Sequence, residues 1–214
     1  MHRIYYMLFF LLQCGNMVSA QSDWRLIAED EGISVFSKSV STSKVKAVKV
    51  ECTLEASASQ LVTLLMDLPV AIQWVSHTKS CTLVKRISPS ELYYYSEVAL
   101  PWPLENRDFV AHVRVTQDAI TKVVTMNAPA VPGWVNENKG VVRIRKSLGY
   151  WTITPLAGNK VQVQYTLQVD PGGIIPAWMV NMLAAQGPME SFKNMRQQIR
   201  LPRYHNVSLP FITN

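Results

Sequence analysis

Residues 161–170 read VQVQYTLQVD, and apolar side chains alternate with polar ones along the whole stretch. The same alternation runs through residues 48–55, VKVECTLE, and through residues 109–116, FVAHVRVT. A period of two places apolar side chains on one face of a strand and polar ones on the other, which favours antiparallel sheets with one wet face. These three stretches therefore predict an antiparallel sheet.

Further strands are expected around this core of three. Successive runs that are rich in apolar and β-branched residues follow one another without intervening helices, which indicates a meander. We expect these strands at residues 33–40, 81–87, 92–100, 122–127 and 141–155.

Two helices interrupt the pattern. Ser57 and Gln60 form a capping-box signature before an apolar helix that should end near Pro69. A longer helix is predicted over residues 174–200, with Pro188 removing its hydrogen bond to the Ala184 carbonyl and kinking the helix. The apolar stripe of this helix predicts an α+β fold in which it lies across the curved sheet. An apolar cavity results wherever the facing side chains do not fill the space between them.

The first twenty residues are typical of an export signal. Arg3 precedes an apolar run at residues 7–12, and small residues at 18–20 stand before a polar segment. The run is far shorter than the ~20 residues that a membrane span needs. We therefore expect cleavage after Ala20 and a periplasmic or secreted location, with residues 21–200 forming one domain and residues 201–214 a tail.

Composition and charge exclude several classes of protein. Hydrophobic residues make up 48% of the chain and charged residues 17%, which excludes a disordered chain. The net charge of +6 is too diffuse for a nucleic-acid binder, so no nucleic acid is expected as a partner. Cys52 and Cys81 lie in strand-like segments, either as separate buried thiols or as a disulfide pair, and no metal-ligand spacing surrounds them.

Catalytic motifs are not evident in the sequence. No glycine–serine nucleophile elbow, phosphate-cradling loop or metal-binding spacing appears. The sequence therefore predicts a protein that is not an enzyme, with no catalytic residues, no cofactor and no metal.

Three motifs together resemble the START domain, the family of lipid-transfer domains related to the steroidogenic acute regulatory protein. They are YSEVALPWPLENRDFV at residues 95–110, GYWTITP at 149–155 and DPGGIIPAWMVN at 170–181. Asp67 and Trp74, around the first helix, also fit. In order and spacing, these motifs extend the resemblance over residues 24–200.

The resemblance implies a helix-grip fold. In this fold a curved antiparallel sheet of about eight or nine strands wraps around the long C-terminal helix and encloses an internal apolar cavity for one lipid. The expected ligand is a phospholipid, a fatty acid or a sterol-like molecule, with transient contact to a membrane and a monomeric protein. The residues expected to bind it are Glu97, Trp102, Arg107, Phe109, Val113, Trp178, Met179, Met182, Met189 and Phe192.

Arg107 shares a strand face with Phe109 and Val113, and should point into the cavity. A buried arginine needs a carboxylate or an anionic ligand, because an unpaired internal charge is very costly. Either it binds a polar or phosphate head group, or it pairs with an acidic neighbour to brace the loop. Glu97, Glu105 and Asp108 are the candidates for that partner.

The loop between residues 101 and 106 would lie beside the C-terminal helix at the mouth of the tunnel. Two prolines bracket Trp102 and make the loop stiff, so the indole is presented in one direction. Val113 stands where some family members have a second cavity arginine, which fits a more apolar tunnel floor.

Two surface features have a structural and a functional interpretation. Trp134 either packs over the sheet edge or dips into a membrane interface. A basic strip near the C terminus is either a solvated face or a docking surface for anionic membranes; it comprises Lys193, Arg196, Arg200 and Arg203.

The main hypothesis is a carrier that shuttles one lipid through water. An enzyme of the same superfamily, such as a polyketide aromatase/cyclase, would need polar residues facing inward, and Tyr93, Tyr95 and Glu97 are its candidates. A sensor or scavenger that holds its lipid without transfer is a third possibility.

Overall fold

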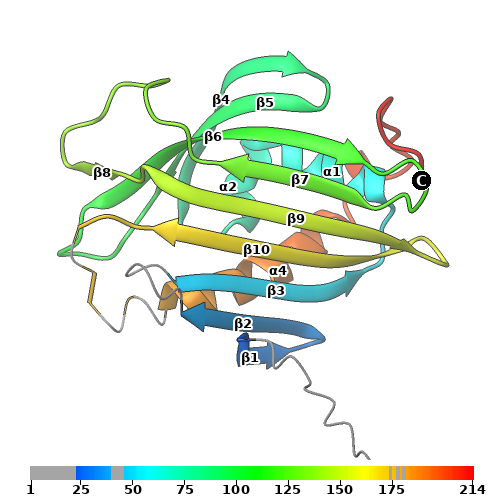
Figure 1. Ribbon diagram of the computed structural model, residues 1–214, viewed down its shortest axis with the longest axis horizontal. Coiled ribbons are helices and arrows are strands. Elements are labelled where there is room, and N and C mark those ends of the chain that lie inside the picture. The colour runs from blue at the N-terminus through cyan, green and yellow to red at the C-terminus, as the bar shows by residue number, and fades with distance from the viewer. Residues whose placement is uncertain (1–22, 40–45, 174, 177–178, 180–181) are drawn as a thin grey trace, which may run out of the picture.

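A single curved antiparallel sheet forms most of the protein, with the helices on one of its faces (Figure 1). The computed structural model describes residues 23–39, 46–173, 175–176, 179 and 182–214, so the expected export signal lies outside them. The strands are β1 (Arg25–Asp30), β2 (Ile33–Ser39), β3 (Lys46–Leu54), β4 (Thr78–Ser88), β5 (Glu91–Val98), β6 (Asn106–Gln117), β7 (Val124–Pro129), β8 (Val141–Arg143), β9 (Lys146–Leu156) and β10 (Lys160–Asp170).

The sheet order is β1-β2-β3-β10-β9-β7-β6-β5-β4, and the predicted helix-grip architecture is confirmed. All three alternating stretches are strands, β3, β6 and β10, and β3 pairs with β10 in the middle of the sheet. The stretch predicted as one strand at 141–155 is two, because the short β8 leaves the meander and pairs in parallel with the start of β6. The first strand, β1, was not predicted.

The helices cover the inner face of the sheet, which is the face turned away from the viewer in Figure 1. They are α1 (Ala58–Met66), the 3-10 turn η1 (Leu68–Val70), α2 (Ala71–Trp74), the π-helical turn η2 (Met182–Gln186), α4 (Gly187–Gln198) and the 3-10 turn η3 (Pro202–Tyr204). In the residues that the structure describes, no helix is long and apolar enough to cross a membrane.

Local sequence explains both principal helices. The predicted capping box is present at α1, where Ser57 Oγ accepts from the Gln60 N–H and Gln60 Oε1 accepts from the Ser57 N–H. The predicted second helix is not uniformly α-helical, since η2 precedes α4. Pro188, in the first turn of α4, has no N–H to donate, and helix geometry changes just before it.

The C-terminal residues pack on the domain. Tyr204 is buried, and its hydroxyl donates to Asp67 Oδ2 at 2.9 Å. Ile212 joins the core, and Asn214 Oδ1 accepts from the Ser59 N–H at 2.9 Å. Residues 201–214 are therefore folded against α1 rather than extended as a tail.

Candidate functional site

Arg107 lies on the inner face of β6, as predicted. It pairs with Val98 across the β5–β6 ladder, and only 4% of its surface is exposed. Its guanidinium donates to three backbone carbonyls, those of Glu105, Pro171 and Gly172, the last two at 3.4 Å. Arg107 therefore ties the end of the β5–β6 loop to the segment that leaves β10.

The predicted carboxylate partner of Arg107 is not found among the described residues. Every ion pair that they form involves other cations, and Asp108 pairs with Arg143 instead. Burial lowers the pKa of Arg107, and the nearby Glu105 carboxylate partly opposes this effect. Arg107 thus braces the loop through carbonyl groups, and the predicted pairing with an acidic neighbour is wrong.

Glu97 is on the opposite face of the sheet from Arg107, which corrects the prediction that it points inward. It pairs with Asp108 across the ladder, whereas Arg107 is one residue away and faces the other side. Its Oε1 accepts from Lys79 Nζ at 2.9 Å and from Asn106 Nδ2 at 2.7 Å. These two hydrogen bonds lower the pKa of Glu97.

Tyr93 and Tyr95 also face outward, so none of the three residues considered for a cyclase lies on the inner face. Tyr93 pairs with His112, and the two rings stack with centroids 4.3 Å apart. The Tyr95 hydroxyl lies 3.2 Å from Asp108 Oδ2.

Part of the inner face keeps accessible surface. We call it the open half, and it begins beside Arg107. Phe109 lies here, as predicted, with its ring edge-on to Tyr94 at 5.8 Å. The half-buried apolar side chains that define this half are Tyr94, Phe109, Ala128, Tyr165 and Leu167.

A second part of the inner face, the packed half, is buried. Phe192 of α4 lies at the boundary between the two halves. Its ring stacks on Trp151 with centroids 5.6 Å apart, and its centroid is 6.2 Å from that of Tyr165. Val113, predicted as a ligand contact, is buried here. The residues that define the packed half are Leu92, Val113, Val124, Ile153 and Val163.

The residues of the C-terminal helix that were predicted to bind lipid differ in their surroundings. Met179 is completely buried, and Met189 is half-buried against the core. Trp178 and the side chain of Met182 lie outside the described residues, although the Met182 backbone begins η2.

Trp102 does not line the inner face. It is 90% exposed, in the loop between β5 and β6. This loop and the Gly172 segment flank Arg107, so the indole stands outside the place where the guanidinium is buried.

The outer face of β5 and β6 carries a cluster that the sequence analysis missed. Arg143 donates to Asp108 Oδ1 at 2.6 Å and to Oδ2 at 3.0 Å, and both side chains are nearly inaccessible. Trp134, from the segment between β7 and β8, stacks on Tyr93 at 4.0 Å. Trp134 therefore packs over the sheet, with 42% of its surface exposed, and Asp108–Arg143 holds this segment against β6.

Two residues of the predicted basic strip are bound to the rest of the domain, whereas Arg200 and Arg203 are exposed. Lys193 forms an ion pair with Asp30, and Arg196 donates to the Glu31 carbonyl. These contacts attach α4 to the turn between β1 and β2.

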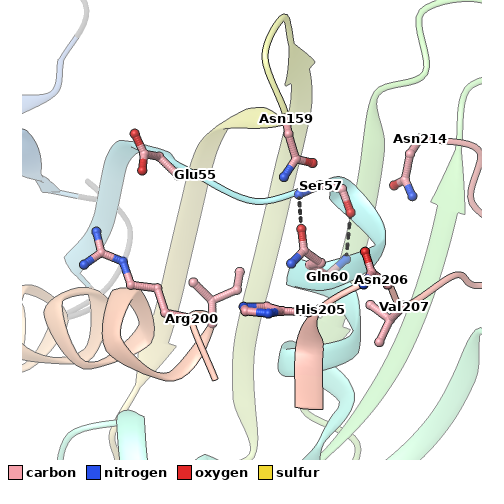
Figure 2. A pocket seen from close by; sticks show the side chains of 10 residues that line it. Glu55, Ser57, Gln60, Asn159, Arg200, His205, Asn206, Val207 and Asn214 are labelled. Carbon is pink, nitrogen blue, oxygen red and sulfur yellow. Dashed lines mark hydrogen bonds between the residues drawn. The ribbon is translucent and has the colours of Figure 1, made fainter. Parts of the chain in front are cut away.

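A polar pocket of about 660 Å³ lies at the other end of the sheet from Arg107, near the start of β10. Figure 2 shows the capping bonds between Ser57 and Gln60 at its edge, and Arg200 reaching it from the end of α4. Because most of its lining residues are polar, this pocket differs in character from the apolar open half. The lining residues are Glu55, Ser57, Gln60, Asn159, Ile199, Arg200, His205, Asn206, Val207 and Asn214.

Cys52 and Cys81 are separate buried thiols, which decides between the two alternatives. Burial raises the pKa of Cys52 to about 11 and that of Cys81 to about 12. Neither is poised as a nucleophile, because the thiolate is the reactive form.

Comparisons with known proteins agree with this geometry. The phosphatidylcholine transfer protein of Mus musculus is 30% identical over 185 residues, which cover 81% of this chain and 82% of the mouse protein. The crystal structure of a STAR-related lipid transfer protein fragment from Xanthomonas axonopodis is 32% identical, with a TM-score of 0.76, over 84% of this chain and 99% of that one. Human STARD10 shares the fold at 22% identity and a TM-score of 0.73, over 87% of this chain and 77% of that one. The START domain model itself matches residues 14–203, and the chain therefore belongs to the START domain family.

Proposed function

We propose that this protein binds one anionic amphiphile and carries it through water. The tail would lie on the open half, and the negatively charged head would lie beside Arg107. The observation that carries the proposal is the burial of the Arg107 guanidinium on the inner face, with backbone carbonyls and no carboxylate as its partners among the described residues.

The charge of Arg107 explains why the head group should be an anion. A guanidinium has five N–H donors, and carbonyls take three of them. Carbonyl dipoles satisfy donors but do not cancel the charge, and an uncompensated buried charge is costly. A phosphate or carboxylate head would supply the missing charge and accept the remaining donors in the geometry that guanidinium favours.

The open half is suited to the tail. Tyr94 and Tyr165 are only half-buried, yet burial raises the pKa of each. Because both rings also lie on the inner face, their accessible surface borders space that a tail could occupy. Exposing a sixteen-carbon chain to water costs roughly 13 kcal/mol at about 0.8 kcal/mol per methylene, so a carrier must cover nearly all of the tail.

Release would take place at a membrane. The exposed indole of Trp102 flanks the Arg107 end of the site, and an amphipathic indole is favoured at the interface between water and lipid. The N-terminal segment supports export to a periplasmic or extracellular compartment, where a carrier of this kind would move lipid between surfaces.

Native mass spectrometry and vesicle transfer test the proposal together. The full chain, purified from two expression hosts, should retain amphiphiles with anionic heads and move a fluorescent fatty acid between vesicles. Arg107→Met should lower affinity at least tenfold. Arg114→Met is the matched control, because Arg114 lies on the outer face of the same strand, and it should leave binding unchanged.

Each outcome decides a part of the proposal. A protein free of lipid from both hosts, with no binding of fatty acid, would contradict it. Equal losses in the two arginine variants would contradict the role of Arg107. Binding without transfer would identify a sensor or scavenger. Trp102→Ala should slow transfer and leave affinity unchanged, and an unchanged transfer rate would exclude Trp102 as the membrane contact.

A further inference from the structure

We propose that the hydroxyls of Tyr94 and Tyr165 form a second recognition point within the open half. They would hydrogen-bond an uncharged polar group, a hydroxyl or a carbonyl, on the apolar body of the ligand. This inference rests on the proposed function and narrows it to amphiphilic anions that carry such a group.

The two tyrosines come from distant strands. Tyr94 is on β5 and Tyr165 is on β10, with β6, β7 and β9 between them in the sheet. Four strand spacings of about 4.8 Å would separate them by roughly 19 Å in a flat sheet. Burial raises the pKa of Tyr94, and the Cys81 thiol and the Tyr165 hydroxyl raise it further. Tyr94 pairs with Ala111 and Tyr165 pairs with Trp151, so both rings lie on the inner face of the curved sheet and face the same interior.

Each ring is fixed by its neighbours. Tyr94 packs edge-on against Phe109, and Tyr165 stacks on Trp151 with centroids 4.2 Å apart. The Tyr165 hydroxyl lies over Gly149, where a Cβ would be in ordinary van der Waals contact with the hydroxyl oxygen at 3.6 Å. The hydroxyls are thus held in place before a ligand arrives, which limits the entropy lost on binding.

Neither hydroxyl has a protein partner in the described part of the chain. The tyrosine hydroxyl bonds found there belong to Tyr95 and Tyr204. A polar group in apolar surroundings is costly without a hydrogen bond. If the ligand were purely aliphatic at this point, phenylalanine would serve better at both positions.

The spacing from Arg107 defines the ligand further. Tyr94 pairs with Ala111, which is four residues along β6 from Arg107, or about 13 Å at 3.3 Å per residue. The polar group would therefore lie on the order of 10 Å from the anionic head. A fatty acid with a mid-chain hydroxyl has this form, whereas stearate lacks the group.

Paired ligands and paired variants test this inference. Displacement of a fluorescent fatty acid from the full chain would be measured with stearate and with a mid-chain hydroxystearate. We expect the unmodified chain to favour the hydroxylated acid about tenfold. Tyr94→Phe and Tyr165→Phe should each reduce this preference, and the double variant should abolish it while still binding stearate. Tyr150→Phe is the matched control, because Tyr150 lies on the outer face of β9.

The outcomes separate the two proposals. Equal affinities for both acids in the unmodified chain, or an unchanged preference in the double variant, would overturn the inference and leave the carrier proposal intact. No displacement by either acid would overturn both. Circular dichroism would show that each variant is folded, and stearate binding by the double variant would show that its site is intact.

Discussion

The two halves of the inner face are built from the same strands and differ in what covers them. In the packed half, α1 contacts β9 and α4 contacts β2, and Ile153 and Val163 are completely inaccessible. In the open half, Tyr94, Phe109 and Tyr165 belong to the same ladders but keep accessible surface. The difference shows that one sheet can be core at one end and binding surface at the other.

The outer face reverses the arrangement. Behind the packed half, the polar side chains of β10 are exposed to water. Behind the open half, the segment between β7 and β8 covers β5 and β6 with the Asp108–Arg143 pair and the Trp134–Tyr93 stack. The β5–β6 part of the open half is thus supported from outside, whereas Asn127 of β7 and Gln168 of β10 are exposed on the outer face.

Truncating one aromatic side chain in each half should give the largest contrast. Phe192→Ala should lower the free energy of unfolding by about 4 kcal/mol, because it opens a cavity beneath Trp151. Phe109→Ala should cost only about 2 kcal/mol, because that ring is already partly uncovered, and it should weaken lipid binding. Urea unfolding of the lipid-free protein would measure both costs, and equal values would show that the open half is packed as tightly as the other.

Removing the outer support should cost about 3 kcal/mol. Asp108→Asn leaves the nearly inaccessible Arg143 guanidinium without its carboxylate, and breaking one side of a buried ion pair is strongly destabilising. Glu137→Gln, which breaks the exposed Arg145 pair of the same segment, is the control and should cost under about 1 kcal/mol. Urea unfolding would measure both variants. A cost for Asp108→Asn no larger than the control would mean that the segment does not support the sheet.

The fold could be predicted from sequence because its signals are local and repeated. Alternation over ten residues in β10 fixes which side chains face inward, and the Ser57–Gln60 capping box marks a helix start with two neighbouring residues. Arg107 and Phe109 were placed correctly by the same rule, since β6 alternates without a bulge along its pairing with β5.

The rest of the site depends on relations between segments. On β5, Tyr93, Tyr94 and Tyr95 are three successive tyrosines, so alternation cannot show which of them faces inward. That ambiguity led to the wrong placement of Glu97. The Asp108–Arg143 pair depends on a parallel contact between β6 and β8, which no periodicity within either strand indicates.

The packing of residues 201–214 against the domain likewise depends on distant contacts. The Tyr204–Asp67 bond joins positions that are far apart in sequence. A short C-terminal segment with little periodicity gives no sign of such a partner.

Alkaline pH tests whether the open half is dry. Cys52 lies on the packed half, whereas Cys81 lies on β4, close enough to Tyr94 to affect its pKa. Burial raises the pKa of Cys52 to about 11 and that of Cys81 to about 12, against about 8.5 for an unfolded thiol. A raised pKa gives stability that is complete below the unfolded value and is lost as the pH rises towards the folded one.

Between neutral pH and about pH 9.5, each thiol should therefore lower the free energy of unfolding by about 1 kcal/mol. Cys52→Ala and Cys81→Ala should each remove its own share of this pH dependence in urea unfolding, and the double variant should remove both. If Cys52→Ala by itself removed the whole pH dependence of the free energy of unfolding, Cys81 would titrate alike in the folded and unfolded protein. Water would then reach Cys81 and fill the open half. Because a wet interior could not shield a hydrocarbon tail, that result would contradict the carrier proposal through a measurement that involves no lipid.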